Sequence, residues 1–394
     1  MPPNVDDTGI NGLPETVLCH ILSFLSTKQA VATSVLSKRW IHLWCSVLSI
    51  EFTNIEVDDL EAYFRFNKSL YSVLLSRTSI KSFRLGIRYG GFHFGYIGIP
   101  HVAKWVDHVV QNGVEHLHLD VATRVDMPKL PASIITCKTL VVLNLNGFTV
   151  NDFSSIRLPS LKILHFESCT FLSVRAFLLV MARCPILEEL QAAHIVFQSD
   201  DSLANQELKS LSFSKLIRVD MICCYCHFPL TALYNVESLR IEIDKMYRPH
   251  DEIPTFHNLT NLKLLSLNCN WPLLIQMLNH CPKLQKLDLS EANVDGDRDG
   301  VQENWVDPEC VPECLSLSLR SCTLLEFFGR ESELLMAKYI LKNASLLQTM
   351  TITGPQHRDY LLSQGPQLHV NSEYIERELS SFPRASATCQ LSFY

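Results

Sequence analysis

The densest group of chemically capable side chains in this sequence is a run of three cysteines and a histidine, Cys223–His227. Structural zinc sites draw thiolate and imidazole ligands as pairs from separate segments, with two or more residues between the members of a pair. Here Cys223 and Cys224 are adjacent, and no second ligand pair lies nearby in the sequence. We therefore expect buried thiols at this position, with no metal ion and no other cofactor.

A second group begins like a calcium-binding loop, at Asp295–Gly300. Such a loop needs a glutamate at its twelfth position, and that position is Val306. The chain also contains no phosphate-binding glycine loop, no paired-histidine zinc motif and no nucleophile elbow. The sequence therefore predicts no catalytic residues and a protein that is not an enzyme.

The bulk composition excludes further classes. The chain has 394 residues, 47% hydrophobic and 19% charged, with a formal net charge of −7. This balance offers no basic surface for nucleic acid, and the length indicates several modules or one elongated repeat array. A signal peptide and a membrane span are both absent from the pattern, so we expect reduced cysteines and a location in the nucleus or cytoplasm.

The elements that could position a binding site begin with a helical segment at residues 13–45. Apolar residues at spacings of three and four predict a first helix after Pro14, Thr27 is a candidate N-cap for a second, and Trp40 and Trp44 lie in a short third. Three helices of this size cannot bury all their large side chains. The surplus apolar surface therefore packs either against the next domain or against a partner, and periodicity alone does not separate the two.

The pattern L-P-x-x-x-L-x-x-I-L-x-x-L, followed by S-V-L-S-K-R-W and L-W, resembles the F-box of plant F-box proteins. The resemblance implies docking onto the adaptor Skp1, which connects to a cullin scaffold and the ubiquitin-conjugating machinery. It implies that the following residues face the adaptor: Leu13, Pro14, Ile21, Leu22, Leu25, Val35, Leu36, Trp40 and Trp44.

From about residue 80 a phrase of the form L-x-x-L-x-L recurs, with 21 to 28 residues between successive copies from Leu117 to Leu287. This period is typical of leucine-rich repeats, whose stacked units share one continuous core. Between the phrases, Val174–Ala182 and Leu273–Asn279 are expected to be helical, and each runs into a Cys-Pro pair.

The residue between the two inward leucines of each strand should face outward from the sheet. Most of these residues are polar, and both charge signs occur: they are His118, Asn144, His165, Gln191, Ser212, Arg240, Ser266 and Asp288. Such a face fits protein recognition, and it fits plain solvent exposure equally well. As candidate target-binding residues we take His165, Gln191, Ser212, Arg240 and Ser266.

The C-terminal part is expected to form a strand at Leu315–Leu319, a helix at Ser332–Asn343, a strand phrase ending at Ile352 and a last strand at Cys389–Phe393. Its E-L-x-x-A-K-Y helix and P-R-A-S-x-T-C-Q ending resemble the FBD module of plant F-box proteins. We expect this module to cap the repeats.

Together these features predict an α/β protein: a three-helix F-box, a leucine-rich-repeat solenoid and a strand-helix-strand C-terminal cap. The expected boundaries are 8–48 for the F-box, 80–290 for the repeats, 291–313 for an acidic loop and 314–394 for the FBD-like module. The expected function is that of the substrate-recognition subunit of a Skp1–cullin–F-box ubiquitin ligase, which binds Skp1 and an unidentified target protein. The alternative is a small-molecule receptor whose repeat pocket binds a ligand that recruits the target.

Overall fold

The computed structural model describes residues 10–90, 92–124, 127–151, 156–199, 201–204, 207–208, 211–243, 252–268, 270–291, 305–355 and 372–394. The chain divides into two units, the first formed by Met1–Leu187 with His194–Ser202 and the second by Glu188–Ala193 with Leu203–Tyr394. Among the described helices, none is long and apolar enough to cross a membrane. The candidate calcium loop at 295–300 and most of the predicted acidic loop lie outside the described residues.

The first unit begins with a small helical bundle. Its segments are η2 (Ile10–Gly12), α1 (Glu15–Ser23), α2 (Thr27–Ala32), η3 (Thr33–Val35), η4 (Lys38–Ile41) and η5 (Leu43–Ser46). The N-cap of α2 is Ser26 and not Thr27 as predicted, because Ser26 and Gln29 exchange side-chain and backbone hydrogen bonds in a capping box. Thr27 is buried instead, and its hydroxyl accepts a hydrogen bond from the backbone N–H of Glu51 at 2.7 Å.

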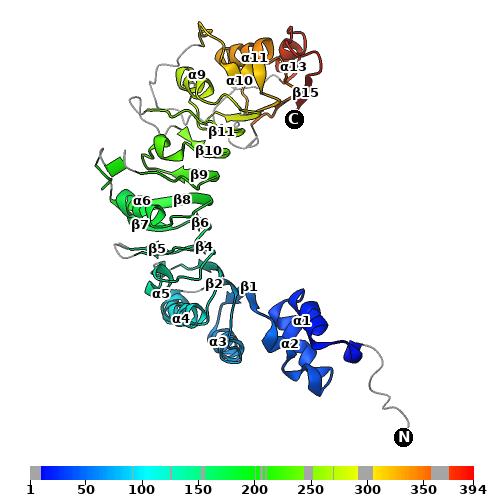
Figure 1. The fold of residues 1–394 in the computed structure, drawn as a ribbon, viewed down its shortest axis with the longest axis vertical. Helices are drawn as coiled ribbons and strands as arrows, with labels where there is room; N and C mark the ends of the chain where they lie inside the picture. Colours follow the sequence, from blue (N-terminus) through cyan, green and yellow to red (C-terminus); the bar gives the residue numbers. More distant parts are fainter. Residues whose placement is uncertain are drawn as a thin grey trace. The chain divides into compact units, whose positions relative to one another are not determined.

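The rest of the first unit is a parallel sheet, and several of the connections between its strands contain helices (Figure 1). Its strands are β1 (Ser49–Val57), β2 (Ser82–Tyr89), β3 (His116–Ala122), β4 (Val142–Asn146), β5 (Thr149–Val150), β6 (Ile163–Glu167), β7 (Thr170–Ser173) and part of β8 (Glu189–Ser199). Its helices are α3 (Leu60–Leu75), α4 (Phe92–Gln111), α5 (Ala132–Ile135) and α6 (Val174–Ala182). The sheet thus starts at Ser49, well before the predicted start of the repeats at residue 80.

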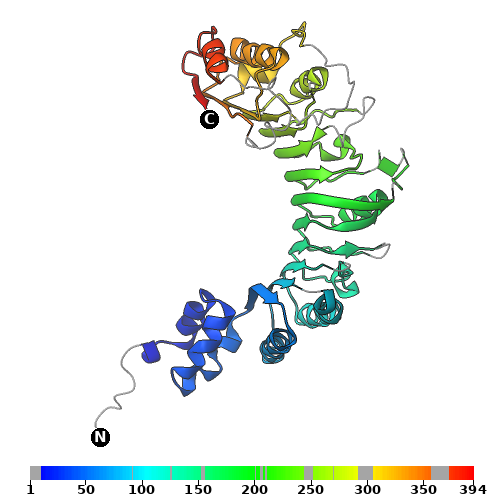
Figure 2. The same cartoon turned by 180° about the vertical axis from the view of Figure 1, so that it is seen from behind.

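The second unit continues the same architecture, and its helices pack on one side of its strands (Figure 2). Its further strands are β9 (Arg218–Cys224), β10 (Ser238–Glu242), β11 (Asn261–Leu265), β12 (Lys286–Ser290), β13 (Ser321–Leu325), β14 (Thr349–Ile352) and β15 (Gln390–Phe393). Its helical segments are η6 (Leu230–Leu233), α9 (Trp271–Asn279), α10 (Glu313–Leu317), α11 (Glu331–Asn343) and α13 (Ser372–Ser380). The C-terminal module therefore adds three parallel strands to the repeat sheet, ending at β15.

One predicted strand in this module is wrong. The alternating segment Leu315–Leu319 belongs mostly to the helix α10, and the strand is β13, which begins only at Ser321. Cys314 and Leu315 are both buried whereas Leu317 is exposed, a pattern that a strand with period two cannot produce. Alternation of leucine and serine over so short a segment did not distinguish the two structures.

The repeats share a turn that the sequence pattern did not reveal. After β4, β6, β11 and β13 the chain passes through one residue with positive φ, and the next residue is buried. These pairs are Gly147-Phe148, Ser168-Cys169, Ser266-Leu267 and Glu326-Phe327, and Cys223-Cys224 at the end of β9 is a fifth. At Gly147 a Cβ atom would also lie 2.4 Å from the carbonyl oxygen of Val121, so that position requires glycine.

The observed strand positions show that two predicted outward-facing residues, Ser266 and Ser212, do not lie in strands. Ser266 is the positive-φ residue after β11, and the outward-facing residue in the middle of that strand is Lys263. Ser212 lies before β9 and outside any strand, so that Asp220 takes the corresponding position. In the β11 segment the leucines fit two possible strand alignments. In the observed alignment a third buried residue lies three positions after the inward pair, as in Leu262-Leu264-Leu267.

The C-terminal module contains a buried acid, Glu333 in the first turn of α11. Its carboxylate accepts a hydrogen bond from the backbone N–H of Arg330 at 2.8 Å, but its Oε1 atom has no hydrogen-bond partner among the described residues. Burial is the main cause that raises the pKa of Glu333 from 4.5 to about 7, and the nearby charge of Glu291 adds to it. The folded state therefore favours the protonated acid.

We expect the stability contributed by this protonated acid to be present below pH 4.5 and lost as the pH rises to about 7. As the pH rises, Glu333 ionises in the unfolded chain before it ionises in the folded chain. The difference between the two pKa values corresponds to about 3 kcal/mol of folding stability. Thermal unfolding of Glu333→Gln should therefore show a weaker loss of stability between pH 5 and 7 than the unchanged chain. Glu331→Gln, on the same helical turn but exposed, serves as the control and should keep the original pH profile.

Candidate functional site

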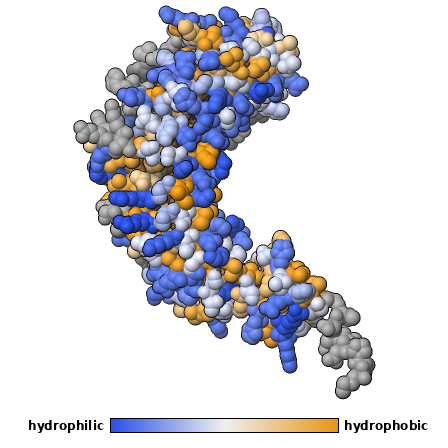
Figure 3. Space-filling view, viewed as in Figure 1, coloured by the Kyte–Doolittle hydropathy of each residue, from blue (hydrophilic) through white to orange (hydrophobic). Residues whose placement is uncertain are grey.

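The first helix of the F-box carries two neighbouring apolar stripes. Leu18 and Leu22 are buried in the bundle core, with Leu25 packed against it. One position earlier in each turn, Val17, Ile21 and Phe24 form a second stripe with the same spacing, and its members are exposed or half-buried. Hydrophobic side chains are visible on the surface over these helices (Figure 3).

Two further apolar side chains project from the short helices that follow. Val35 is 86% exposed and Leu36 is 59% exposed, although both are large aliphatic residues. Ile41, from the contacting helix η4, is exposed as well. Exposed apolar side chains gathered on so small a bundle indicate a surface that a partner covers.

The structure divides the nine predicted adaptor-facing residues into three groups. Pro14, Val35 and Leu36 are exposed. Leu13, Ile21, Leu25 and Trp44 are half-buried and keep part of their surface available. Leu22 and Trp40 are 0% and 1% exposed in the core of the bundle, so they do not fit the prediction of direct adaptor contact.

This correction has a simple physical cause. Leu22 and Trp40 pack with Leu18, Ala30 and Leu43, so their side chains hold the helices together and offer no surface to a partner. Conversely, the motif did not indicate the exposed residues Val17, Phe24 and Ile41. The signal that could have found Val17 and Phe24 is the unusual width of the apolar face of α1.

Two arginines fix this bundle within the first unit. Arg39 donates from Nη2 to the carbonyl oxygen of Leu13 at 2.7 Å, and thereby joins η4 to the start of the motif. Arg77, after α3, donates to the carbonyl oxygens of Val47 and Ser49 and lies over the ring of Trp44. Burial lowers the pKa of Arg77 to about 10. Arg77 thus ties the segment after α3 to the end of the helical bundle and to the first residue of β1.

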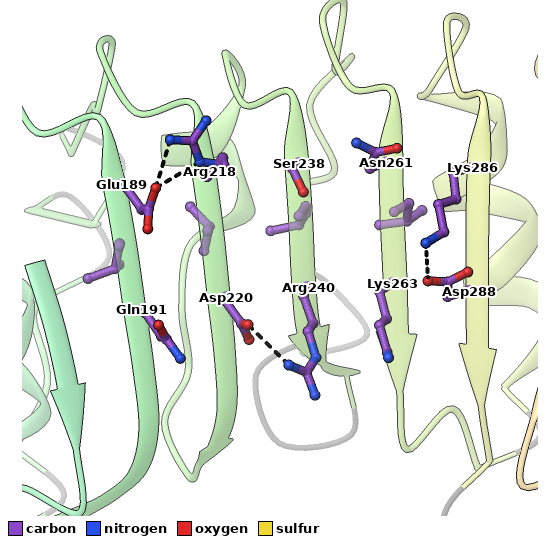
Figure 4. Close-up of a pocket in the computed structure, with 14 residues that line it drawn as sticks. Glu189, Gln191, Arg218, Asp220, Ser238, Arg240, Asn261, Lys263, Lys286 and Asp288 are labelled. Carbon is purple, nitrogen blue, oxygen red and sulfur yellow. Dashed lines mark hydrogen bonds and ion pairs between the residues drawn. The ribbon is translucent and has the colours of Figure 1, made fainter. Parts of the chain in front are cut away.

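In the second unit the outward face of the sheet carries a shallow groove of about 370 Å³. Two rows of side chains cross its strands (Figure 4). One row follows the paired residues Asp220, Arg240, Lys263 and Asp288 on β9 to β12. The other follows the paired residues Arg218, Ser238, Asn261 and Lys286.

Most charges in the groove are paired. Arg218 Nη2 lies 2.8 Å from a carboxylate oxygen of Glu189, and Arg240 Nη1 lies 3.1 Å from Oδ2 of Asp220. Lys286 Nζ lies 3.3 Å from Oδ2 of Asp288. Arg240 on β10 therefore pairs with a carboxylate on the adjacent strand β9.

Two of the five predicted target-binding residues lie in the groove. Gln191 and Arg240 line the groove, and Figure 4 shows Gln191 beside Asp220. His165, in the middle of β6, belongs to the first unit. Ser266, in the turn after β11, donates from its hydroxyl to the carboxylate of Glu242 at the end of β10. Ser212 lies before β9 and outside any strand. The sequence analysis did not identify the groove residues Asp220 and Lys263, because it placed the outward-facing strand positions at Ser212 and Ser266.

The cysteine run at 223–227 lies at the end of β9. Cys224 is buried at the core position of the repeat turn and donates from its thiol to the carbonyl oxygen of Ala192 at 3.4 Å. Cys226 is also buried, and burial raises the pKa of its thiol to about 12. No group of three or more metal-ligating side chains occurs within the part of the chain that the structure describes.

The sequence matches three family models in the order predicted. Residues 10–51 match the F-box domain, residues 102–225 match the repeats of "FBD-associated F-box protein At5g56370, LRR repeats", and residues 307–352 match FBD. The helical bundle, the repeat sheet and the C-terminal module are therefore an F-box, leucine-rich repeats and an FBD region.

Full-length relatives combine the same three parts. The chain is 30% identical to F-box/FBD/LRR-repeat protein At4g00160 of Arabidopsis thaliana, over 98% of this chain and 94% of the relative. It is 29% identical to FBD-associated F-box protein At3g52670 of the same plant, over 98% and 97%. The chain belongs to the F-box/FBD/LRR-repeat protein family.

Proposed function

We propose that this protein is the substrate-recognition subunit of a Skp1–cullin–F-box ubiquitin ligase. Its F-box binds a Skp1-like adaptor, its repeats bind a target protein, and the protein itself performs no catalytic step. Holding the target beside the ubiquitin-conjugating machinery raises the effective concentration of the reacting groups.

The observation that carries the proposal is the unpartnered apolar surface of the F-box. Phe24, Val35 and Leu36 are each more than half exposed, on a bundle whose own core is already filled by other side chains. Burying such side chains in an interface contributes roughly 1.5–3 kcal/mol each. A partner with a complementary apolar groove therefore gains substantial binding energy without disturbing the bundle.

The repeat part supports the second half of the proposal. Its strands present outward rows of polar and charged side chains with both signs, a composition that suits recognition of a protein surface. The groove residues are held in register by backbone pairing, so their charges keep fixed positions. Such a preformed surface loses little conformational entropy when it binds.

The proposal is tested by reconstitution of the complex. The purified chain is mixed with a plant Skp1-like adaptor and analysed by size-exclusion chromatography with light scattering. We expect a one-to-one complex that also recruits a cullin and its ubiquitin-conjugating enzyme. Two results would contradict the proposal: no adaptor complex at micromolar concentrations, or ubiquitin transfer by the chain in the absence of a cullin.

A further inference from the structure

The groove of the second unit has an unequal balance of charge. Its lining includes the cations Arg218, Arg240, Lys263 and Lys286 and the carboxylates Glu189, Asp220 and Asp288. Three of the cations form the ion pairs described above. Lys263 makes no ion pair with any described residue, so the groove has one cation in excess.

Lys263 also lies at the middle of the row. In the strand register it stands opposite Arg240 on β10 and Asp288 on β12. Burial lowers the pKa of Lys263, and the positive charge of Arg240 lowers it further. Because Arg240 and Lys263 are paired in the strand register, a negative group placed between them would be attracted by both cations.

Several polar atoms of the same row lack partners. Nε of Arg240, Oδ1 of Asp220 and Oδ1 of Asp288 are buried without a hydrogen-bond partner in the described part of the chain. One of these is a donor and two are acceptors, and each costs free energy while it stays unsatisfied. Because these atoms are buried, a ligand that supplies one acceptor flanked by N–H donors reaches them only when the three side chains turn outward as it binds.

We propose that this groove binds an extended acidic segment of the target protein, with one aspartate or glutamate carboxylate seated between Arg240 and Lys263. The inference rests on the proposed role in target recognition. Backbone N–H groups on either side of the acidic residue donate to Asp220 and Asp288. Four strands spaced about 4.8 Å apart span roughly 14 Å, which about four residues of extended chain cover.

The charge balance selects a carboxylate over a phosphate. Glu189, Asp220 and Asp288 already neutralise Arg218, Arg240 and Lys286, so a single negative charge balances the groove. A phosphoester carries almost two negative charges at neutral pH and would be repelled by the two flanking carboxylates. An acidic peptide segment is therefore the occupant that the observed charges favour.

The test is selection of random twelve-residue peptides, displayed on phage, against the purified full-length chain. The enriched sequences should share one acidic residue among uncharged neighbours. The leading peptide is then synthesised with glutamate, glutamine or phosphoserine at that position, and binding is measured by fluorescence anisotropy. The glutamate form should bind most tightly, and the glutamine form roughly tenfold more weakly.

Variants of the chain locate the binding site. Lys263→Gln should weaken binding of the glutamate peptide roughly tenfold, and Lys263→Glu should weaken it further. Lys283→Glu makes the same charge change at an exposed residue outside the groove and should leave binding unchanged. Circular dichroism checks that the variants keep the native fold.

Several results would overturn the inference. These are no enriched peptide, enrichment of peptides without carboxylates, tighter binding of the phosphoserine form, equal loss in Lys283→Glu, or a dimer of the chain that Lys263→Glu dissociates. Adaptor binding is measured with the same protein preparations. If the chain binds the peptide but not the adaptor, the proposed function is rejected and the peptide-binding role of the groove stands. If it binds the adaptor but no peptide, only the peptide-binding role of the groove is rejected.

Discussion

The double variant Val35→Asp with Leu36→Asp is expected to lose adaptor binding while the chain remains folded. Both side chains are exposed in the free protein, so the carboxylates stay in water and the stability of the bundle changes little. In the proposed complex the same positions are covered by the adaptor, and a buried carboxylate without a partner is strongly unfavourable. The loss of two apolar contacts alone should weaken binding at least about a hundredfold.

The measurement is isothermal titration of the Skp1-like adaptor into each protein, with thermal unfolding recorded alongside. The matched control is Leu60→Asp with Leu75→Asp, which changes two exposed leucines of α3 outside the F-box. That control should bind the adaptor normally. Normal binding by the Val35 and Leu36 variant would show that the exposed surface of η3 is not the adaptor contact.

Trp40→Ala is expected to unfold the F-box and to leave the repeat sheet intact. Trp40 is 1% exposed and packs with Leu18, Leu22 and Leu43 in a core of only a few side chains. Removing such a large buried side chain typically costs about 3–5 kcal/mol. A small bundle has little stability in reserve, so this loss should be enough to open it.

Hydrogen exchange resolved by mass spectrometry should show lost protection in residues 15–46 and unchanged protection in the strands from β3 onward. Trp40→Phe retains an aromatic ring in the core and should recover most of the protection. The experiment also decides the role of this residue. If Trp40→Ala kept full protection but failed to bind the adaptor, Trp40 would be a direct contact, as the F-box resemblance implied.

Several features of this protein were determined by the sequence alone. The F-box pattern at 13–45 and the E-L-x-x-A-K-Y helix of the FBD pattern are dense enough to identify both regions, and the family models match them. Strand phrases such as Leu143-Leu145 and Leu164-Phe166 form strands as predicted, because inward residues of a buried parallel strand must be apolar. The helix Val174–Ala182 begins and ends at the predicted residues, since Ser173 caps its start.

Only the tertiary structure decided which apolar residues are core and which are surface. Leu22 and Val35 belong to the same motif, yet one is 0% and the other 86% exposed. A local sequence pattern shows that a side chain is apolar. Whether that side chain is buried depends on how the neighbouring helices pack against it. The conserved-looking spacing of a motif therefore cannot separate residues that build the bundle from residues that bind a partner.

The same limit applies to the groove. Lys263 and Asp220 are adjacent to Arg240 only because three strands from different repeats pair in one register. A shift of strand frame by an odd number of residues exchanges inward and outward side chains, and the leucine-rich segment near 265 permitted such a shift. Near 211 the leucine phrase lies before the strand β9, so the pattern indicated the wrong segment. The sequence determined that this protein has repeats with a polar outward face, and backbone pairing determined which charges meet on it.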